Sequence, residues 1–310
     1  MKEYTSDQIR NVALAGHSGA GKTSIVEMIL FNKKMTDRLG RVEDGTTVSD
    51  YDPEEVRRRC SINTALVPVE HRGIKINILD LPGYRDFIGE IRNSMRAADA
   101  LIIVVDASAG VEPGTELAWE LAEDFRLPRL FVINKIDRER ASYAKTLEAL
   151  RETFGCRLVQ ANLPVGEAGG FKGCVNLLKM QMSSGDGGRV SYGEIPAEMK
   201  AEAEAQRAAL VEVAAEGDDE LTMKFLEGES LSAEEILRGL EEDMLALRCV
   251  PVVAASALQG PGCVGLLDFV VDCFPPPTHC PAVEAKDPKT GEPIELRYKA
   301  DEPTAAFVFK

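Results

Sequence analysis

The sequence contains no apolar stretch long enough to cross a membrane. Apolar runs such as residues 101–105 and 130–133 have the length of buried strands, well below the ~20 residues that a transmembrane helix needs. The first five residues are polar and contain no apolar core of a signal peptide. We therefore expect a cytoplasmic protein with no membrane partner.

Closely spaced cysteine pairs are also missing. Seven cysteines are scattered over 310 residues, and none forms a C-x-x-C pair. An odd number of cysteines without metal-binding spacing favours reduced thiols packed in cores over disulfides or a zinc site.

Positive charge is scarce. Lys and Arg number 36 against 51 Asp and Glu, which gives a formal net charge of −15. Such acidity disfavours direct binding of DNA or RNA by these residues. If the protein acts on an RNA machine, we expect the contact to be made by another region or through a basic protein.

What the sequence does contain is a G-x-x-x-x-G-K-T motif at residues 16–23. A strand-like run at 11–15 precedes it and a helical pattern at 23–30 follows, which favours a phosphate-binding loop over a coincidental glycine-rich turn. Glycines let several backbone N–H groups face one phosphate, Lys22 can reach the β- and γ-phosphates, and Thr23 can ligate Mg²⁺. The predicted nucleotide-binding residues of this loop are His17, Ser18, Gly19, Ala20, Gly21, Lys22, Thr23 and Ser24.

A second motif, D-L-P-G at residues 80–83, ends the strand predicted at 74–79. Asp80 can hold Mg²⁺ through water, and the Gly83 N–H can reach a γ-phosphate. The alternative is a plain strand-terminal turn. The preceding phosphate loop favours the nucleotide interpretation.

The N-K-I-D motif at residues 134–137 indicates the base. Asp137 can accept hydrogen bonds from both the N1–H and the exocyclic amine of guanine, a pair that adenine does not offer. Asn134 can meet the other edge of the purine, and Lys135 can lie against the ring or its loop. The backbone of Ser256, Ala257 and Leu258 can serve the guanine carbonyl. A site of this kind rejects the wrong base and so disfavours an ATP-using enzyme.

The order of predicted elements indicates an α/β fold with a mainly parallel sheet. Helices are expected over residues 85–97, 112–125, 143–154 and 262–274, with an irregular stretch at 33–60. From about residue 156 the alternation breaks: short strands at 157–161 and 171–177, a loop at 183–188, and helices at 196–215, 219–226 and 232–247. It resumes with a strand at 250–255. We expect a discontinuous domain, 1–155 plus 250–277, with an α+β insert at 156–249. Residues 278–310 are expected to form a linker, loop-like before one strand at 304–310 that opens a truncated following domain.

Together these motifs resemble the GTPase domain of the translational GTPases, and most closely that of elongation factor G and its paralogues. The resemblance covers residues 8–277; the insert matches the G′ subdomain of that branch, and residues 51–63 lie where the family has its first switch. It implies a three-layer P-loop GTPase fold, GTP or GDP and Mg²⁺ as ligands, GTP hydrolysis, and action on the ribosome. Contact of the insert with the ribosomal stalk protein is also implied, against the simpler interpretation of a solvated acidic face.

Three departures from the family pattern concern hydrolysis. Gly19 replaces an aspartate of the phosphate loop, and Tyr84 replaces the histidine that positions the attacking water. Ser61 stands where the family has a Mg²⁺-binding threonine, with Thr64 as the alternative. Lys22, Gly83 and Tyr84 are the predicted catalytic residues, and Thr23, Ser61 and Asp80 the metal ligands. We expect either a ribosome-dependent GTPase, slow in isolation, or a nearly inactive GTP-binding regulatory module that recycles or protects ribosomes.

Overall fold

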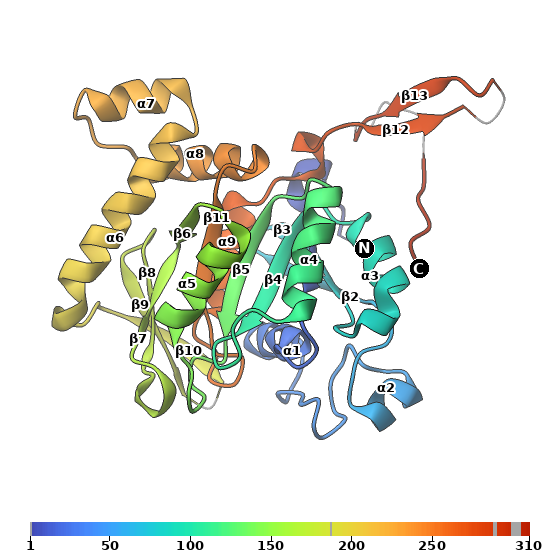
Figure 1. The fold of residues 1–310 in the computed structure, drawn as a ribbon, viewed down its shortest axis with the longest axis horizontal. Coiled ribbons are helices and arrows are strands. Elements are labelled where there is room, and N and C mark those ends of the chain that lie inside the picture. The colour runs from blue at the N-terminus through green and yellow to red at the C-terminus, as the bar shows by residue number, and fades with distance from the viewer. Residues whose placement is uncertain (1, 187, 288–289, 299–304) are drawn as a thin grey trace.

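The computed structural model describes residues 2–186, 188–287, 290–298 and 305–310. Its centre is a seven-stranded sheet in the order β2-β3-β1-β4-β5-β11-β6 (Figure 1). Only β2 is antiparallel to its neighbour; the other pairs are parallel. The predicted α/β fold with a mainly parallel sheet is confirmed. The strands are β1 Ile9–Ala15, β2 Ala65–His71, β3 Ile74–Asp80, β4 Ala100–Asp106, β5 Arg129–Asn134, β6 Leu158–Gln160 and β11 Val250–Ala254.

Helices cover both faces of this sheet and bury two separate cores. In β1, Val12 and Leu14 belong to one core, and Ala13 and Ala15 to the other, because successive strand side chains point to opposite faces. Helices α1 (Lys22–Asn32) and α9 (Cys263–Cys273) cover the first core. Helices α3 (Ile88–Met95), α4 (Pro113–Asp124) and α5 (Tyr143–Phe154) cover the second. In Figure 1, α4 and α5 lie in front of the sheet.

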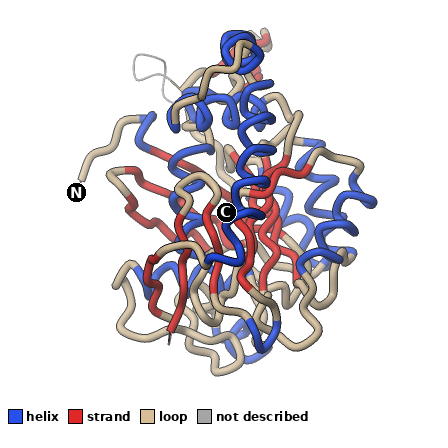
Figure 2. The backbone as a smooth tube through the Cα atoms, turned by 90° about the vertical axis from the view of Figure 1, so that its left-hand side faces the viewer, coloured by secondary structure: helices blue, strands red, loops and turns tan. Residues whose placement is uncertain are grey.

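The direction of the strands gathers the sequence motifs at one edge. Residues 16–23 follow β1, Asp80 ends β3, Asn134 ends β5, and Ser256 follows β11. Because these strands are parallel, their carboxyl ends meet at the same edge, where α/β sheets bind ligands. Figure 2 shows loops gathered below the strands at this edge.

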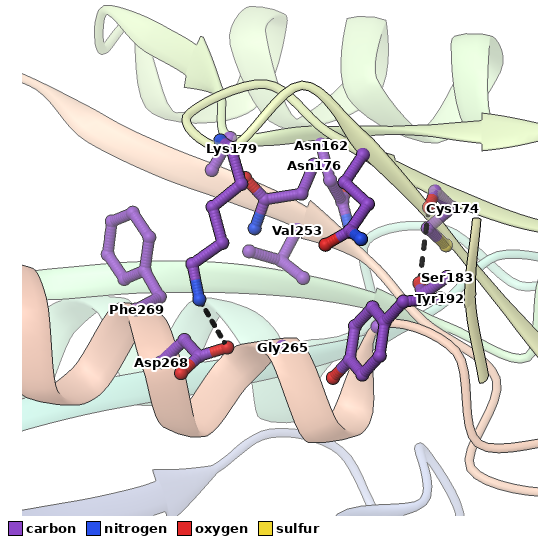
Figure 3. Close-up of a pocket in the computed structure, with 13 residues that line it drawn as sticks. Asn162, Cys174, Asn176, Lys179, Ser183, Tyr192, Val253, Gly265, Asp268 and Phe269 are labelled. Carbon is purple, nitrogen blue, oxygen red and sulfur yellow. Dashed lines mark hydrogen bonds and ion pairs between the residues drawn. The ribbon is translucent and has the colours of Figure 1, made fainter. Parts of the chain in front are cut away.

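The insert forms an antiparallel sheet in the order β10-β9-β8-β7 and three helices. Its elements are β7 Asn162–Val165, β8 Gly173–Asn176, β9 Gln181–Asp186, β10 Arg189–Gly193, α6 Ala197–Glu216, α7 Asp219–Leu226 and α8 Ala233–Leu245. Lys179 joins this sheet to α9 through a 2.9 Å ion pair with Asp268 (Figure 3). Strand β6 pairs with β11, so residues 158–160, assigned by sequence to the insert, form the edge of the main sheet.

The prediction of a loop at residues 183–188 is wrong for most of that segment. Residues 183–186 pair with β10 as part of β9, whereas Gly187 lies outside the described residues. Serine and glycine disfavour strands in isolation, but pairing with a neighbouring strand overrides that preference.

Residues 33–60, predicted to be irregular, contain helix α2 (Pro53–Arg58). Asp52 caps it by accepting a 2.8 Å hydrogen bond from the Glu54 amide, and Pro53 opens its first turn. The D-P-E-E sequence carried this signal.

The C-terminal predictions also need correction. Strands β12 (Val283–Lys286) and β13 (Pro293–Leu296) form an antiparallel pair where a loop was expected (Figure 1). Of the strand predicted at 304–310, residue 304 lies outside the described residues, and residues 305–310 adopt no regular structure. A strand needs a neighbour to satisfy its backbone; here the chain is instead held by side chains, with Arg96 stacked 4.7 Å from the Phe307 ring centroid. No helix in the described part of the chain is long and apolar enough to cross a membrane.

A buried carboxylate just before β4 yields a stability prediction. Asp99 is 8% exposed and accepts a 2.8 Å hydrogen bond from Asn11 Nδ2, and burial raises its pKa to about 6. The folded state therefore binds this proton more tightly than the unfolded state, so the destabilisation is full above pH 6 and fades towards pH 4. Asp99→Asn should raise the free energy of unfolding at pH 7.5 by roughly 1–3 kcal/mol. Urea denaturation at pH 7.5 and 4 measures this; an equal gain at both pH values would contradict it.

Candidate functional site

The phosphate loop closes around the ammonium group of Lys22. Its side chain is buried, and Nζ donates hydrogen bonds to the Gly16 and His17 carbonyl oxygens, each at 3.0 Å. Burial lowers the Lys22 pKa to about 8, against the opposing effect of Asp80 and Asp50. A buried cation at the N-terminus of α1, beside several backbone N–H groups, is an environment that favours an anion.

Two glycines let other motifs touch this loop. Gly21 has φ +99°, and a Cβ there would lie 2.3 Å from Asn134 Nδ2. A Cβ on Gly83 would lie 2.6 Å from Lys22 Nζ and 2.7 Å from the Ser18 nitrogen. The 80–83 segment therefore passes directly over the phosphate loop, where a γ-phosphate could meet the Gly83 amide.

Hydroxyl and carboxylate oxygens gather beside the loop. Thr23 Oγ1 donates to Asp80 Oδ2 at 2.8 Å and lies 3.3 Å from Ser61 Oγ, which in turn donates to Asp50 Oδ1 at 2.7 Å. Burial raises the pKa of Asp80 to about 6. Its Oδ1 is buried without a hydrogen bond of normal geometry, although the Ser49 hydroxyl faces the carboxylate.

This oxygen cluster fits Mg²⁺. An under-coordinated buried carboxylate oxygen next to two hydroxyls is the hard-oxygen donor set that this ion prefers. Among the described residues, no three or more His, Cys, Asp and Glu side chains form a metal site. Mg²⁺ typically takes only one or two carboxylates and completes its coordination with waters and phosphate oxygens. Thr64, the alternative ligand, faces elsewhere: its Oγ1 lies 2.6 Å from Ser94 Oγ.

The third motif lines a second groove that adjoins the first. The two grooves have empty volumes of about 1110 and 890 Å³. The first is lined by the phosphate loop, Ser61, Gly83 and Tyr84, and the second by Asn134, Asp137, Ala257 and Leu258. Both share the following residues: Gly21, Ser24, Glu43, Lys135 and Arg138. The two grooves thus adjoin along these five residues, with the phosphate loop lining the first and the Asp137 carboxylate lining the second.

Comparison with known proteins identifies this arrangement. A sequence profile of the Elongation factor Tu GTP binding domain matches residues 7–276. The chain belongs to this family of GTP-binding domains. Elongation factor G 2 of Syntrophus aciditrophicus (strain SB) is 36% identical over 307 residues, which are 98% of this chain and 45% of that protein. A crystal structure from Thermus thermophilus matches with a TM-score of 0.82 and 35% identity, over 93% of this chain and 44% of that one.

These matches confirm the resemblance to an elongation factor G-like translational GTPase. The GTP-binding domain spans less than half the length of the relatives that it matches.

Within the GTP-binding domain, Asn134 and Lys135 have contacts that sequence reasoning did not anticipate. Asn134 is fully buried; Nδ2 donates to the Ala20 carbonyl at 3.0 Å, and Oδ1 accepts from the Ala257 amide at 3.0 Å. Lys135 Nζ bonds the Gly19 carbonyl and Asp106 Oδ2, each at 2.5 Å. Both side chains therefore tie the base motif to the phosphate loop.

The 256–258 backbone is partly engaged. The Ser256 amide donates to the Pro261 carbonyl at 3.0 Å, and the Ala257 amide serves Asn134. The Leu258 amide makes no hydrogen bond within the described residues, which leaves it as the donor that a base carbonyl could use.

Two predicted residues turn their side chains away from the groove. Ala20 is buried in the core beside the loop. The His17 ring faces the start of α4, where Nδ1 accepts from the Gly114 amide at 3.3 Å and Nε2 lies 3.5 Å from Glu112. Only their backbone belongs to the phosphate loop.

Sequence reasoning also missed three side chains at the site. Asp106, which ends β4, pairs with Lys135; Asp50 holds Ser61; and Arg138 lines both grooves. The position of Asp106 at a strand end was the one signal available, since the carboxyl ends of parallel strands share an edge.

Proposed function

We propose that this domain binds GTP and GDP with Mg²⁺ and hydrolyses GTP as the switch of an elongation factor G-like translation factor on the ribosome. The observation that carries the proposal is the pair of adjoining grooves, one lined by Lys22 and the phosphate loop and the other by Asp137. The different chemistry of the two grooves suits a guanine nucleotide, and the Asp137 carboxylate disfavours adenine.

At the phosphate end, Lys22 and the amides of residues 17–24 neutralise and orient the phosphate tail. Because Gly83 passes close over the loop, its amide can bind a γ-phosphate, and loss of that phosphate would release residues 80–84. At the base end, Asp137 selects guanine and the Leu258 amide serves its carbonyl. Asn134 and Lys135 hold the two ends at a fixed separation.

Thr23, Ser61 and Asp80 are the residues that would hold Mg²⁺, which when bound neutralises phosphate charge. Asp80→Asn removes the carboxylate that fixes Thr23 Oγ1. We expect GDP affinity to lose most of its dependence on Mg²⁺. The increase in GDP affinity that Mg²⁺ causes in the wild type should become about tenfold smaller, since charge-assisted hydrogen bonds contribute ~1.5–3 kcal/mol. Titration of a fluorescent GDP analogue with and without EDTA measures this. Undiminished stimulation would exclude Asp80 from the metal site.

Tyr84 supports the alternative of a slow or inactive regulatory module. Its ring is 46% exposed at the mouth of the phosphate groove, and a phenol is a poor proton acceptor near neutral pH. Single-turnover GTP hydrolysis with and without ribosomes separates the two functions. Ribosome stimulation supports the GTPase; nucleotide binding without stimulation, in a protein that carries the domains beyond residue 310, supports the module that recycles or protects ribosomes.

The insert offers a surface for a partner. On α7, Met223 and Leu226 are 58% and 74% exposed, and α7 packs against α6, whose sequence is rich in glutamate. Exposed apolar residues close together favour contact with another protein, and the resemblance to elongation factor G implies the ribosomal stalk protein as that partner. Ribosomes stripped of stalk protein should stimulate GTP hydrolysis less than intact ribosomes. Equal stimulation would mean that this surface is a solvated face and does not bind the stalk protein. A role on the ribosome agrees with a cytoplasmic protein. We propose 1–155 with 250–277 as the GTPase domain, to whose sheet β6 adds the edge strand, the rest of 156–249 as the insert, and 278–310 as the linker to a following domain.

A further inference from the structure

A buried carboxylate on α1, Glu27, makes no ion pair with any cation in the described part of the chain. Glu27 is 1% exposed and lies one helical turn after Thr23, on the same face of the helix. Its Oε1 accepts a 2.6 Å hydrogen bond from the Val48 amide. Burial raises the pKa of Glu27, while the amides of Val48, Ser49 and Gly40 oppose the shift.

These amides belong to one segment, residues 40–50, which we call the cover loop. At Gly40 the loop backbone touches the carboxylate so closely that a Cβ would lie 2.2 Å from Oε2. That oxygen has no hydrogen bond of normal geometry. The Glu27 carboxylate therefore contacts the cover loop near both of its ends, at Gly40 and at Val48, and faces backbone amides of that loop.

The cover loop in turn reaches both grooves of the proposed nucleotide site. Residues 40, 41, 43 and 44 line the base groove, and residues 42 and 43 line the phosphate groove. Two residues after Val48, Asp50 holds Ser61 at 2.7 Å, and Ser61 lies 3.3 Å from Thr23. One face of α1 thus carries both the predicted metal ligand Thr23 and Glu27. Glu27 fixes the cover loop, and the cover loop holds Ser61 beside Thr23.

An apolar side chain would suit stability better at this position. The neighbouring residues Ile25, Val26 and Met28 are fully buried in the core, and an unpaired buried carboxylate is costly. The cost is offset only while the loop amides stay in place. The buried Glu27 carboxylate is therefore stabilised only when the cover loop is closed over it.

We propose that Glu27 is a positioning residue that holds the cover loop closed over the nucleotide and so sets the preference for GTP over GDP. This inference rests on the proposed function. Of the three proposed Mg²⁺ ligands, Ser61 is the one that the cover loop holds, through Asp50, whereas Thr23 lies on α1 and Asp80 ends β3. We expect this third ligand to matter most when a γ-phosphate adds negative charge beside the metal. Loosening the loop should therefore weaken GTP binding more than GDP binding.

The test is Glu27→Gln, which keeps the shape of the side chain but removes its charge and turns one acceptor into a donor facing amides. Affinity for a non-hydrolysable GTP analogue should fall about tenfold, equal to about 1.4 kcal/mol, with GDP affinity within about twofold. Trypsin should also cut faster after the exposed Arg38 and Arg41 in the analogue-bound form. A merely structural role would weaken both nucleotides equally.

Two further variants make the result decisive. Gly40→Ala leaves Glu27 intact but pushes the loop from the carboxylate, and should give the same selective loss. Asp243→Asn removes another 1% exposed carboxylate, on α8 of the insert, and should leave the GTP-to-GDP ratio unchanged. An unchanged ratio and unchanged protection in Glu27→Gln, or in Gly40→Ala should the first variant not fold, would overturn the inference. Wild-type protein that binds neither nucleotide would instead overturn the proposed function.

Discussion

Asparagine in place of Asp137 should convert the domain from a guanine-binding to a xanthine-binding protein. Asp137 lines the base groove together with Ala257 and Leu258, and its carboxylate has only acceptors to offer to the N1–H and amine of guanine. Asparagine offers a donor, which matches the 2-carbonyl of xanthine and opposes the guanine amine. GDP affinity should fall by on the order of 10³-fold, since a site built around buried hydrogen bonds penalises the mismatched ligand heavily.

Calorimetric titration of wild type and variant with GDP and XDP measures this reversal. Glu139→Gln is the matched control, because it removes an exposed carboxylate two residues away. It should leave both affinities unchanged. A variant that still prefers GDP over XDP would show that the base does not lie in this groove, and the proposed function would lose its main support.

The gathering of the site was predictable because it depends on strand direction alone. Each motif directly follows, or ends, a buried apolar run, and parallel strands place their carboxyl ends at one edge of the sheet. Given the alternation of strands and helices, strand direction accounts for the meeting of residues 16–23, Asp80 and Asn134 at one edge. Helix α5 begins and ends where the periodicity placed it, since its apolar spacing and flanking residues agree.

The contacts between motifs were not predictable, because they depend on distances that only the folded chain defines. Nothing in the sequence indicates that the Asn134 carboxamide bonds the backbone of Ala20 and Ala257 and is therefore not free to bind a base. From the sequence alone, Glu27 is indistinguishable from an ordinary polar residue of a helix. Its burial against residues 40–49 arises because the cover loop folds back over α1. Strand β9 was missed for a different reason: Ser183, Ser184 and Gly185 have low strand propensity, and pairing with the adjacent strands β8 and β10 overrides it.

Tyr84→His should accelerate hydrolysis without altering nucleotide binding. Tyr84 follows Gly83, which lies against Lys22, so its side chain is set at the mouth of the phosphate groove, where the attacking water would approach. A phenol has an ordinary pKa of ~10, whereas an imidazole titrates near neutral pH and both orients water and accepts its hydrogen bonds. Single-turnover GTP hydrolysis in the presence of ribosomes should rise about 10- to 100-fold, within the range of general acid–base effects.

Tyr84→Phe separates the hydroxyl group from the ring. If the phenol oxygen orients water in the wild type, the phenylalanine variant should hydrolyse GTP more slowly than wild type while binding GDP equally well. Equal rates for wild type and Tyr84→Phe would mean that the phenol takes no part and would favour the regulatory module. Equal or slower turnover of Tyr84→His would remove position 84 from the reaction, since the groove would then already be incompetent for a reason other than the missing imidazole.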